Sequence, residues 1–421
     1  MGELNIGGVP VSELKERYGT PLYIFDEAMI RGRIGEFRES FVSEEFDTDV
    51  LYASKAFTCI QMIKIIKDEG LSLDVVSGGE IYTALKAGMD PAKLFFHGNN
   101  KTPEEIAFAL DNGVGTFILD NIQEAKAVVE AMKGREQTLK VMLRINPGID
   151  AHTHKYVVTA NIDSKFGISA ESKDEIAELV KIFDSTENIS FEGIHAHIGS
   201  QIFDKNAFVA EIEKLCSFMK DMEQQYGIRC NALDLGGGFG ARYTDDDAPI
   251  PVPEVCSTIL ETCSRCKKEN SLSFSKVLIE PGRSIVAEAG YTLYTVGWTK
   301  ETPHKKYAFI DGGMPDNIRP ALYGAKYDAD IANRMGEPKT EEYCIAGKCC
   351  ESGDIIIEKT MLQHPEQGDL LVTYTTGAYG YAMSMRYNQI GRPAVVFVNK
   401  GTSRLAVKRE TYEDMLRGEI E

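Results

Sequence analysis

The strongest constraint on the fold is a regular alternation of short apolar runs with amphipathic segments. The runs are rich in β-branched residues and begin near Asp49, Leu71, Lys93, Thr116 and Lys140, in steps of about 22 to 24 residues. The segments between them have helical periodicity. The stretch TPEEIAFALDNG, for example, opens with a Thr-Pro start signal and ends at a glycine. This alternation predicts parallel strands covered by helices.

The alternation continues, with longer segments between the apolar runs, through SFEGIHAHIG, ALDLGGGF and SKVLIEPG. Together these runs make eight candidate strands between Asp49 and Gly282. Eight strand–helix units favour a closed (β/α)8 TIM-like barrel over an open sheet. After Gly282 the pattern changes to strand-like segments with turn signals and little helix, such as DIIIEK and PAVVFVN. We expect an α/β barrel over residues 31–283 and a C-terminal β-rich domain over residues 284–421, which residues 1–30 are expected to join.

Composition narrows the class of function. The 421 residues carry a formal net charge of −18, which argues against nucleic-acid or anionic-membrane surfaces because these need clustered Lys and Arg. Nine scattered cysteines do not resemble a small disulfide framework, and no apolar run reaches membrane-spanning length. The opening MGELNIGG lacks the pattern of a secretion signal. We expect a soluble, cytoplasmic protein with a small-molecule substrate.

Polar and glycine-rich features gather where the expected barrel strands end. Active sites of this architecture lie at the carboxyl ends of the strands. The features are Lys55, His97, Arg144, Asn146, His197, the glycines 236–238 and the segment 280–283. Their gathering at one end of nearly every strand favours an enzyme.

Lys55, in YASKAF, has two interpretations. A lysine at a strand end can simply extend its charged tip to solvent, and considered alone the residue is more typical of this role. It can also be a Schiff-base lysine, whose pKa falls on desolvation so that the amine attacks a carbonyl.

The run Gly236–Gly238, in LGGGFG, lies at an expected strand-to-helix turn. Successive amide N–H groups of such a run can surround a phosphate, although tight turns also use glycine freely. Its position favours phosphate, because the loops after strands seven and eight are the usual phosphate site of this barrel. Ser200, in HIGSQ, could add a hydroxyl donor.

Glu280, in IEPGR, ends the eighth strand beside this expected phosphate site. A carboxylate against the pyridine nitrogen of a pyridoxal ring keeps the nitrogen protonated and makes the ring a strong electron sink. An arginine there would leave the nitrogen unprotonated. A solvated strand-end glutamate is the alternative.

Two histidine pairs raise the question of a metal. His195 and His197 are two residues apart in HAHIG, and His152 and His154 repeat the spacing in an expected loop. No third ligand follows either pair at convincing spacing, so we expect no metal site. His197 is better interpreted as a ring packed on a flat cofactor.

The sequence also holds a CxxC motif, Cys263-Ser-Arg-Cys266, in an expected helix that includes Cys256. The spacing puts all three cysteines on one helical face. Redox or metal chemistry would want an active-site loop or a second cysteine pair. We expect small buried residues instead.

From about Tyr23 to Phe397 the chain resembles the fold-type III pyridoxal-phosphate enzymes of the alanine-racemase-like group, and most closely the diaminopimelate decarboxylase family. The resemblance covers almost the whole chain, and several of its motifs are long. They are YASKAF, DVVSGGE, FFHGNNK, INPGIDAHTH, SKFGI, HAHIGSQ, DLGGGFG, EPGR, DGGM, RPALYG, CESGD and TTGAYGYAM, in the order that the family has them.

For the cofactor, the resemblance implies pyridoxal 5′-phosphate on Lys55, with His197 stacked on the ring and Glu280 at the pyridine nitrogen. It also implies a set of residues at the phosphate end or around the site. These are Ser200, Gly236, Gly237, Gly238, Pro281, Gly282, Arg283 and Tyr379, the last of which is also a substrate contact.

For the reaction, the resemblance implies decarboxylation of meso-2,6-diaminopimelate to L-lysine and carbon dioxide, the last step of lysine biosynthesis, with Cys350 as the catalytic acid. The implied substrate contacts are Arg283, Arg319 and Tyr323 for carboxylates and Glu351 for an amine. In these families the loop with the cysteine and the glutamate reaches the other subunit's barrel. The resemblance therefore implies a homodimer with two shared active sites.

Substrate choice also has a physical basis. Diaminopimelate carries both a carboxylate and an ammonium group at its distal end, and charge-assisted pairs with such groups are specific. Arg319 together with Glu351 would supply the cation and the anion. An arginine at this place would repel the distal ammonium of ornithine.

The chain departs from the family pattern at three places. Phe57 stands where asparagine is usual, Gly347-Lys348-Cys349 where Gly-Pro precedes the cysteine, and the end of the tyrosine motif, MRYNQIGRPA, is irregular. None of these changes removes a catalytic group. Two cysteines are adjacent, and Cys350 is taken as the proton donor because it directly precedes ESGD.

Alternatives remain. The first is a pyridoxal-phosphate decarboxylase of another diamino acid or of a carboxy-polyamine. A racemase is disfavoured because it would prefer arginine to Glu280. From another class, the chain could be a non-catalytic pyridoxal-phosphate-binding regulator, although the presence of both Lys55 and Cys350 argues against it.

Overall fold

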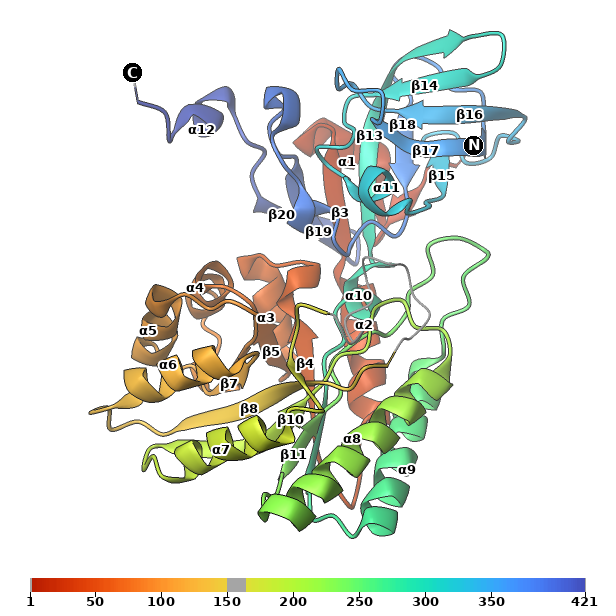
Figure 1. Cartoon of the computed structure of the whole chain (residues 1–421). Coiled ribbons are helices and arrows are strands. Elements are labelled where there is room, and N and C mark those ends of the chain that lie inside the picture. Colours follow the sequence, from red (N-terminus) through yellow and green to blue (C-terminus); the bar gives the residue numbers. More distant parts are fainter. Residues whose placement is uncertain (1, 150–163, 421) are drawn as a thin grey trace. The chain divides into compact units, whose positions relative to one another are not determined.

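The computed structural model describes residues 2–149 and 164–420. The chain forms two compact units (Figure 1). The barrel unit comprises Ile34–Gly240 and Pro249–Gly282. The β unit comprises Met1–Arg33, Ala241–Ala248 and Arg283–Glu421.

Eight parallel strands close into a ring in the barrel unit, because the last strand pairs with the first through Lys276 opposite Asp47. This confirms the predicted (β/α)8 barrel and its eight strands. The strands, in the order of their pairing, are β4 (Asp47–Ala53), β5 (Ser72–Val75), β6 (Leu94–Phe96), β7 (Thr116–Leu119), β8 (Leu139–Asn146), β10 (Ile189–His195), β11 (Ala232–Asp234) and β12 (Lys276–Ile279).

Helices follow the strands and surround the barrel (Figure 1). The expected start signal is confirmed at α5, where Thr102 and Glu105 form a reciprocal capping box. The helices are α2 (Glu27–Ser40), α3 (Ile60–Asp68), α4 (Gly78–Lys86), α5 (Pro103–Asp111), α6 (Ile122–Met132), α7 (Lys173–Asp184), α8 (Lys205–Tyr226) and α9 (Val252–Asn270); a short strand, β9 (Ile168–Ser169), pairs with β8.

The barrel has an apolar interior. Six of its strands each contribute one side chain to a buried cluster, as expected for a barrel whose lumen is packed rather than open. The cluster consists of Leu51, Phe95, Ile118, Met142, Ala232 and Leu278. Outside the barrel, Cys256, Cys263 and Cys266 are all buried on α9, which confirms their interpretation as core residues.

The β unit is mostly sheet, as predicted. One of its interior strands comes from the N-terminal part of the chain: β3 (Leu22–Asp26) is fully buried and lies between β13 (Gly290–Glu301), which is antiparallel to it, and β19 (Ala394–Asn399), which is parallel to it. The other strands are β1 (Asn5–Ile6), β2 (Val9–Pro10), β14 (Lys306–Ile310), β15 (Ala329–Ile331), β16 (Glu341–Ala346), β17 (Ile355–Leu362), β18 (Leu370–Thr373) and β20 (Thr402–Val407).

Four short helices belong to the same unit: α1 (Val11–Tyr18), α10 (Arg283–Val286), α11 (Arg319–Tyr323) and α12 (Tyr412–Leu416). Its core is lined by residues from α1, β3, β13, β18 and β19, including Leu14, Ile24 and Leu293. Every helix in the described part of the chain falls short of the length and apolar character that a membrane-spanning helix needs.

Candidate active site

The carboxyl ends of the barrel strands carry most of the predicted cofactor residues. Lys55 lies in a single 3-10 turn, Ser54–Ala56, directly after β4, and its side chain is exposed. Its ammonium charge acts on the imidazole of His197, which follows β10. Burial, and then the charges of Lys55 and Arg144, hold the pKa of His197 well below its usual value. The His197 ring is therefore neutral near pH 7 and close to the predicted cofactor lysine.

A second lysine at this end of the barrel, Lys101, differs from Lys55. Its side chain is fully buried, and its ammonium donates to Gly98 O at 2.9 Å, Ile118 O at 2.7 Å and Glu124 Oε1 at 2.6 Å. An ammonium group has three protons to donate, so these partners occupy all of them. Lys101 is thus a structural lysine that fixes the end of β7, and Lys55 remains the candidate for covalent chemistry.

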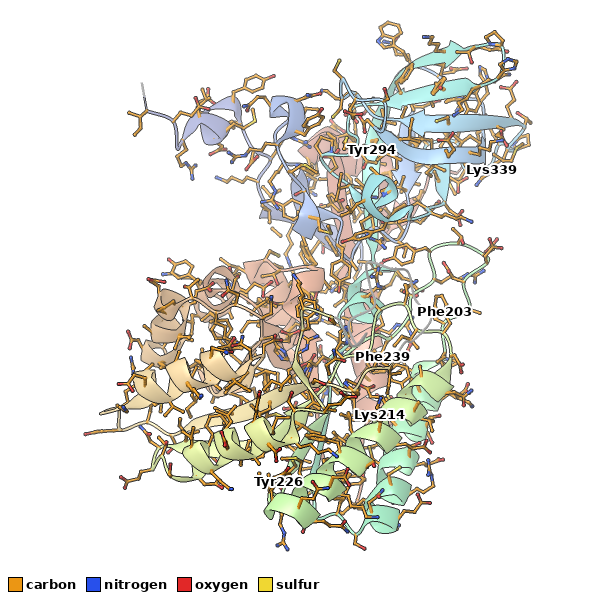
Figure 2. All side chains as sticks on the ribbon, viewed as in Figure 1. Phe203, Lys214, Tyr226, Phe239, Tyr294 and Lys339 are labelled. Atoms are coloured by element: carbon orange, nitrogen blue, oxygen red, sulfur yellow. The ribbon has the colours of Figure 1, made fainter. Side chains whose placement is uncertain are left out.

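The glycine run after β11 packs tightly on its neighbours. Gly236 has φ +62°, and a Cβ there would lie 2.6 Å from Ala196 O. Gly238 has φ +102°, and a Cβ there would lie 2.7 Å from Ile202 Cδ1. Phe239, which is labelled in Figure 2, follows the run directly. Its ring packs on that of Phe208 of α8 at a centroid distance of 5.4 Å and anchors the run. Only glycine fits these two positions, because a side chain would strain the backbone at positive φ and its Cβ would clash with neighbouring atoms.

Two of the three amides in the run have partners inside the barrel. Gly236 N donates to Asp234 Oδ1 at 2.9 Å, and Gly237 N donates to His197 Nδ1 at 3.1 Å. The second bond makes Nδ1 an acceptor, so the neutral His197 ring carries its proton on Nε2. Among the described residues only Gly238 N, of these three amides, lacks such a partner.

The loop after β10 lies beside this run. Ile202 N donates to Gly238 O at 2.9 Å, and Ile202 pairs with Phe239 in an isolated parallel bridge. Ser200 lies in that loop and is half-buried, two residues before the bridge. The structure thus brings the predicted phosphate residues of both loops to one place.

The loop after β12 lies beside the turn that carries Lys55. Ala53 N donates to Pro281 O at 3.3 Å, and a Cβ on Gly282 would lie 2.8 Å from Ala53 Cβ. Pro281 and Gly282 are both buried. The motif EPGR is therefore needed for close packing against the end of β4.

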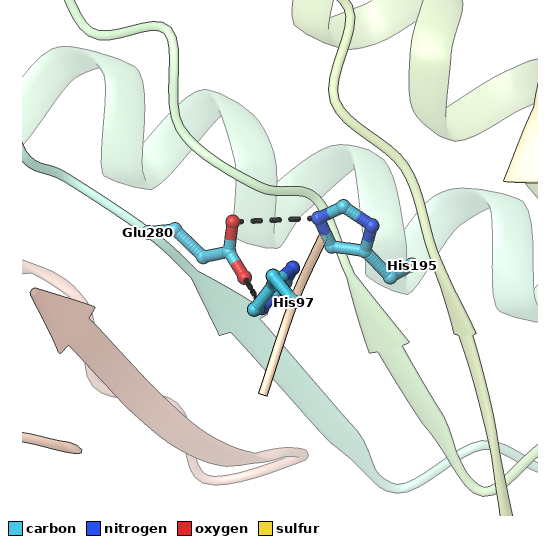
Figure 3. Close-up of side chains that lie close together, drawn as sticks. All are labelled: His97, His195 and Glu280. Atoms are coloured by element: carbon cyan, nitrogen blue, oxygen red, sulfur yellow. Dashed lines mark hydrogen bonds and ion pairs between the residues drawn. The ribbon is translucent and has the colours of Figure 1, made fainter. Parts of the chain in front are cut away.

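Glu280 lies at the centre of a buried polar cluster with His97, which follows β6, and His195, which ends β10 (Figure 3). Glu280 Oε2 accepts from His195 Nε2 at 3.3 Å, and His97 Nε2 lies 2.8 Å from Oε1. The His97 contact is an ion-pair distance without hydrogen-bond alignment, so Oε1 is a buried acceptor with no aligned donor among the described residues.

The electrostatics of the cluster favour an ionised Glu280. Burial by itself raises the pKa of the Glu280 carboxyl, but the neighbouring imidazoles of His97 and His195 outweigh the effect of burial and hold the pKa well below its usual value. Two further buried acids surround it. Burial, and then the charge of Glu280, raises the pKa of Asp234 well above the usual value, and burial raises that of Asp74.

These flanking acids were not predicted as site residues. Asp74 lies in β5 and Asp234 ends β11, both inside runs that are otherwise apolar. A single acid within a buried strand is a signal that the sequence does carry, since a buried carboxyl needs a partner. Neither His97 nor His195 was assigned to Glu280 beforehand, although both lie at strand ends.

The cluster also bears on the metal question. One ligand atom each from His97, His195 and Glu280 lie within 4.8 Å of one another, which is a geometry that could hold an ion. In space, His195 thus has two neighbouring ligand candidates that the spacing of the sequence did not indicate. His152 and His154 lie outside the described residues. The prediction of no metal stays a prediction.

A second group of predicted residues lies in the β unit around two arginines. Arg319, at the start of α11, is 6% exposed, donates to Tyr327 OH at 2.5 Å and lies 4.7 Å from the centre of the Tyr243 ring. Arg283 donates to Tyr243 OH at 2.6 Å and lies 4.8 Å from the Tyr379 ring centre. Tyr243 and Tyr327 were not predicted, because no motif marked them.

Arg319 has an incomplete set of partners. Within the described residues, no carboxylate forms an ion pair with this guanidinium, and its polar neighbours are tyrosines. A buried guanidinium is costly unless it is paired, so the cluster is suited to receive an anionic group. The backbone of Tyr379 adds a further sign of function, because its φ of +59° is rare for a residue with a side chain. Tyr323 ends α11 and is half-buried.

Cys350 and Glu351 lie in the loop between β16 and β17, and both side chains are exposed. The loop is organised by Asp354, which is 2% exposed. Asp354 accepts from Met314 N at 2.6 Å and from Cys349 N at 2.7 Å. The last residue of the motif CESGD therefore fixes the loop.

The two adjacent cysteines differ in environment. Burial, and then the neighbouring Asp354 carboxylate, raises the pKa of the Cys349 thiol to about 12. The backbone N–H of Cys350 donates to Asn388 Oδ1 at 2.8 Å, and its side chain is exposed. The Cys349 thiol thus lies against the Asp354 carboxylate, whereas the Cys350 thiol is accessible to solvent.

The comparisons with known proteins agree with these features. Residues 27–287 match the family model described as pyridoxal-dependent decarboxylase, pyridoxal binding domain. Fold and matched residues thus define the class: the chain is a pyridoxal-dependent decarboxylase.

Relatives narrow the class further. Diaminopimelate decarboxylase from Bacillus subtilis strain 168 is 47% identical over 417 residues, which cover 99% of this chain and 95% of the relative. The enzyme of the same name from Mycobacterium tuberculosis strain H37Rv is 38% identical over 431 residues, which cover 100% and 95%. The crystal structure of diaminopimelate decarboxylase from M. jannaschii in co-complex with L-lysine is 34% identical, with a TM-score of 0.93 over 100% of this chain and 96% of that one. The chain belongs to the diaminopimelate decarboxylase family.

Proposed function

We propose that this protein decarboxylates meso-2,6-diaminopimelate to L-lysine and carbon dioxide with pyridoxal 5′-phosphate as its cofactor, the last step of lysine biosynthesis. Membership of the family supports this reaction. The assignment of the substrate rests on Arg319. A buried guanidinium without a carboxylate partner among the described residues suits a substrate with a distal carboxylate. A diamino acid such as ornithine has no distal carboxylate.

The barrel unit fits the cofactor. Lys55 would hold it covalently, the neutral ring of His197 would pack on its face, and Glu280 would face its pyridine nitrogen. Glu280 Oε1 supports this assignment, because it is a buried acceptor without an aligned donor among the described residues. Ser200, Gly238, Gly282 and Arg283 would hold the phosphate end, with the other glycines of the run shaping the loop. When bound, the cofactor supplies a conjugated ring that accepts the electron pair released as carbon dioxide leaves.

Two side chains of the protein, those of Glu280 and Cys350, would control protonation during the reaction. The carboxylate of Glu280 would keep a proton on the pyridine nitrogen, since an ionised acid stabilises a cation beside it. Cys350 would then donate a proton to the carbon from which carbon dioxide departs. Cys349 is the poorer donor because its thiol lies against Asp354.

Two charged groups would recognise the distal end of the substrate. Arg319 would bind the carboxylate and Glu351 the ammonium group, both through charge-assisted hydrogen bonds. Arg283, Tyr323 and Tyr379 would complete the substrate contacts. Tyr243 supports both arginines, because it stacks under Arg319 and accepts from Arg283.

The active protein is proposed to be a homodimer. Cys350 and Glu351 are both exposed, and among the described residues the Glu351 carboxylate accepts from Gly353 N of the same loop and from Tyr387 OH. An exposed catalytic loop is what a site completed by a second subunit requires. A cytoplasmic location is also proposed, which nine free cysteines support.

The proposed function is tested by product analysis of the purified protein with pyridoxal phosphate and meso-diaminopimelate. We expect stoichiometric lysine and carbon dioxide, and we expect borohydride to fix the cofactor on the peptide that contains Lys55. Lys55→Ala should lose both the product and the label. A label on Lys101, or lysine formation by Lys55→Ala, would refute the assignment.

A further inference from the structure

Two histidines approach the Glu280 carboxylate from different strands and different directions (Figure 3). The rings of His97 and His195 have centres 4.9 Å apart and planes inclined at 75°. All three side chains are nearly inaccessible, with 5% of His97, 1% of His195 and 5% of Glu280 exposed. Neither histidine is expected to touch a substrate from this position, so their role must act through Glu280.

The protonation of His195 follows from its surroundings. Burial lowers the pKa of His195 to about 4, although the neighbouring Glu280 charge opposes the shift. The ring is therefore neutral near pH 7, and because an ionised carboxylate can only accept, its one proton lies on Nε2. His195 Nδ1 agrees with this tautomer, since it is buried and has no hydrogen-bond partner among the described residues.

The same two histidines decide where the negative charge of the cluster lies. Glu280 shares its surroundings with Asp74, whose Oδ1 lies 3.9 Å from His97 Nε2, and with Asp234, which holds Gly236 N. Lys55 and Arg144 are the cations that act on this group of acids. Three buried carboxyl groups cannot all be ionised so close together. The ring N–H groups stabilise the charge on Glu280 in preference to the other two acids.

We infer that His97 and His195 are positioning residues that keep the Glu280 carboxylate ionised and oriented toward the pyridine nitrogen of the cofactor. The inference rests on the proposed function. His195 fixes Oε2 by a hydrogen bond. His97 lies against Oε1 without an aligned bond, so this oxygen keeps its accepting capacity for the pyridinium proton.

The test compares leucine and glutamine at each histidine. Glutamine Nε2 lies about where histidine Nε2 does, so His195→Gln and His97→Gln keep a polar N–H group beside the carboxylate, whereas His195→Leu and His97→Leu remove it. The main measurement is the nitrogen NMR shift of pyridine-labelled cofactor on the enzyme, which reports protonation without turnover. His364, whose ring lies 3.3 Å from Glu341 on the surface of the β unit, provides the matched control His364→Leu.

We expect a protonated pyridine nitrogen in the wild type, both glutamine variants and the control, and an unprotonated nitrogen in the leucine variants. The leucine variants should lose about 10- to 100-fold in kcat, with KM for diaminopimelate little changed, because the contact acts on the cofactor and not on substrate binding. Glutamine variants as impaired as the leucine variants would overturn the inference, as would leucine variants with a protonated nitrogen.

A measurement on the wild type keeps the inference testable if a leucine variant does not fold. In histidine-labelled protein, the His195 ring should be neutral with its proton on Nε2. A cationic ring or a proton on Nδ1 would contradict the inference. A wild type that binds the cofactor with a protonated nitrogen but makes no lysine would refute the proposed function alone, and one that binds no cofactor would refute both.

Discussion

Replacement of Arg319 by leucine is the change that most sharply separates diaminopimelate from other diamino acids. The substitution removes a buried guanidinium that has aromatic and hydroxyl neighbours, Tyr243 and Tyr327, but no carboxylate partner in the described part of the chain. The distal carboxylate of the substrate would then lose its cation. Substrates without that carboxylate would lose nothing, and would gain from the removal of a like charge.

The size of the effect follows from burial. Arg319 is 6% exposed, so its pair with a bound carboxylate would be largely desolvated. Leaving one partner of such a pair alone costs ~2–5 kcal/mol. That corresponds to roughly a 30-fold to several-thousand-fold fall in kcat/KM at ~1.4 kcal/mol per tenfold.

Two variants separate charge from packing. Tyr327→Phe removes only the hydroxyl that accepts from Arg319, and one hydrogen bond from a charged donor is worth ~1.5–3 kcal/mol, so a fall of roughly 10- to 150-fold is expected. Arg319→Lys keeps the charge but loses the planar fork, and should fall between Tyr327→Phe and Arg319→Leu.

The assay is steady-state carbon dioxide release with meso-diaminopimelate, ornithine and lysine, at equal cofactor saturation. We expect Arg319→Leu to lose activity on diaminopimelate alone, with any weak activity on the other two unchanged or raised. An equal loss on all three amino acids would refute the reasoning, because Arg319 would then hold the fold or the cofactor.

Further predictions concern the dimer, the catalytic loop and stability. Mixing inactive Lys55→Ala with inactive Cys350→Ala should restore part of the activity if each site takes one residue from each chain; no recovery, with subunit exchange shown separately, would place both in one chain. Asp354→Ala removes a buried acceptor of two backbone amides, each such charge-assisted bond being worth ~1.5–3 kcal/mol, so kcat should fall and chemical denaturation should shift to lower denaturant. Glu211, on α8, is fully buried without a hydrogen-bond partner in the described residues, and burial raises its pKa well above the usual value. The unfolded state releases that proton at lower pH than the folded state, so wild-type stability should fall as pH rises above ~4.3, by up to ~1.4 kcal/mol per pH unit, and Glu211→Met should remove this dependence. Identical pH profiles of unfolding in the two proteins would contradict it.

The barrel could be predicted because its strands are short apolar runs, the first five of them at a nearly constant spacing, and most of their residues are buried. The site residues at strand ends followed from that prediction, since a barrel fixes which end carries the chemistry. Lys55 and Glu280 could be located in this way without any knowledge of their partners. The start of the helix at Thr102 could also be predicted from the sequence, because a capping box depends only on residues within one helical turn.

Contacts made by closure of the barrel could not be predicted. His97 and His195 meet at Glu280 only because β6, β10 and β12 converge at one end of a ring, and no local pattern carries that information. Arg319 and Tyr243 likewise meet through the tertiary fold of the β unit.

The position of the N-terminal strand β3 (Leu22–Asp26) in the sheet could not be predicted from the sequence either. Its apolar pattern fits any buried strand, and its place between β13 and β19 is a long-range pairing.

Carbon dioxide release from separate incubations with meso-diaminopimelate, ornithine and arginine measures directly which amino acid this protein decarboxylates. We predict rapid release from diaminopimelate with lysine as the product, and little or none from the other two. Release from ornithine or arginine at a rate equal to or above that from diaminopimelate would show that diaminopimelate is not the preferred substrate.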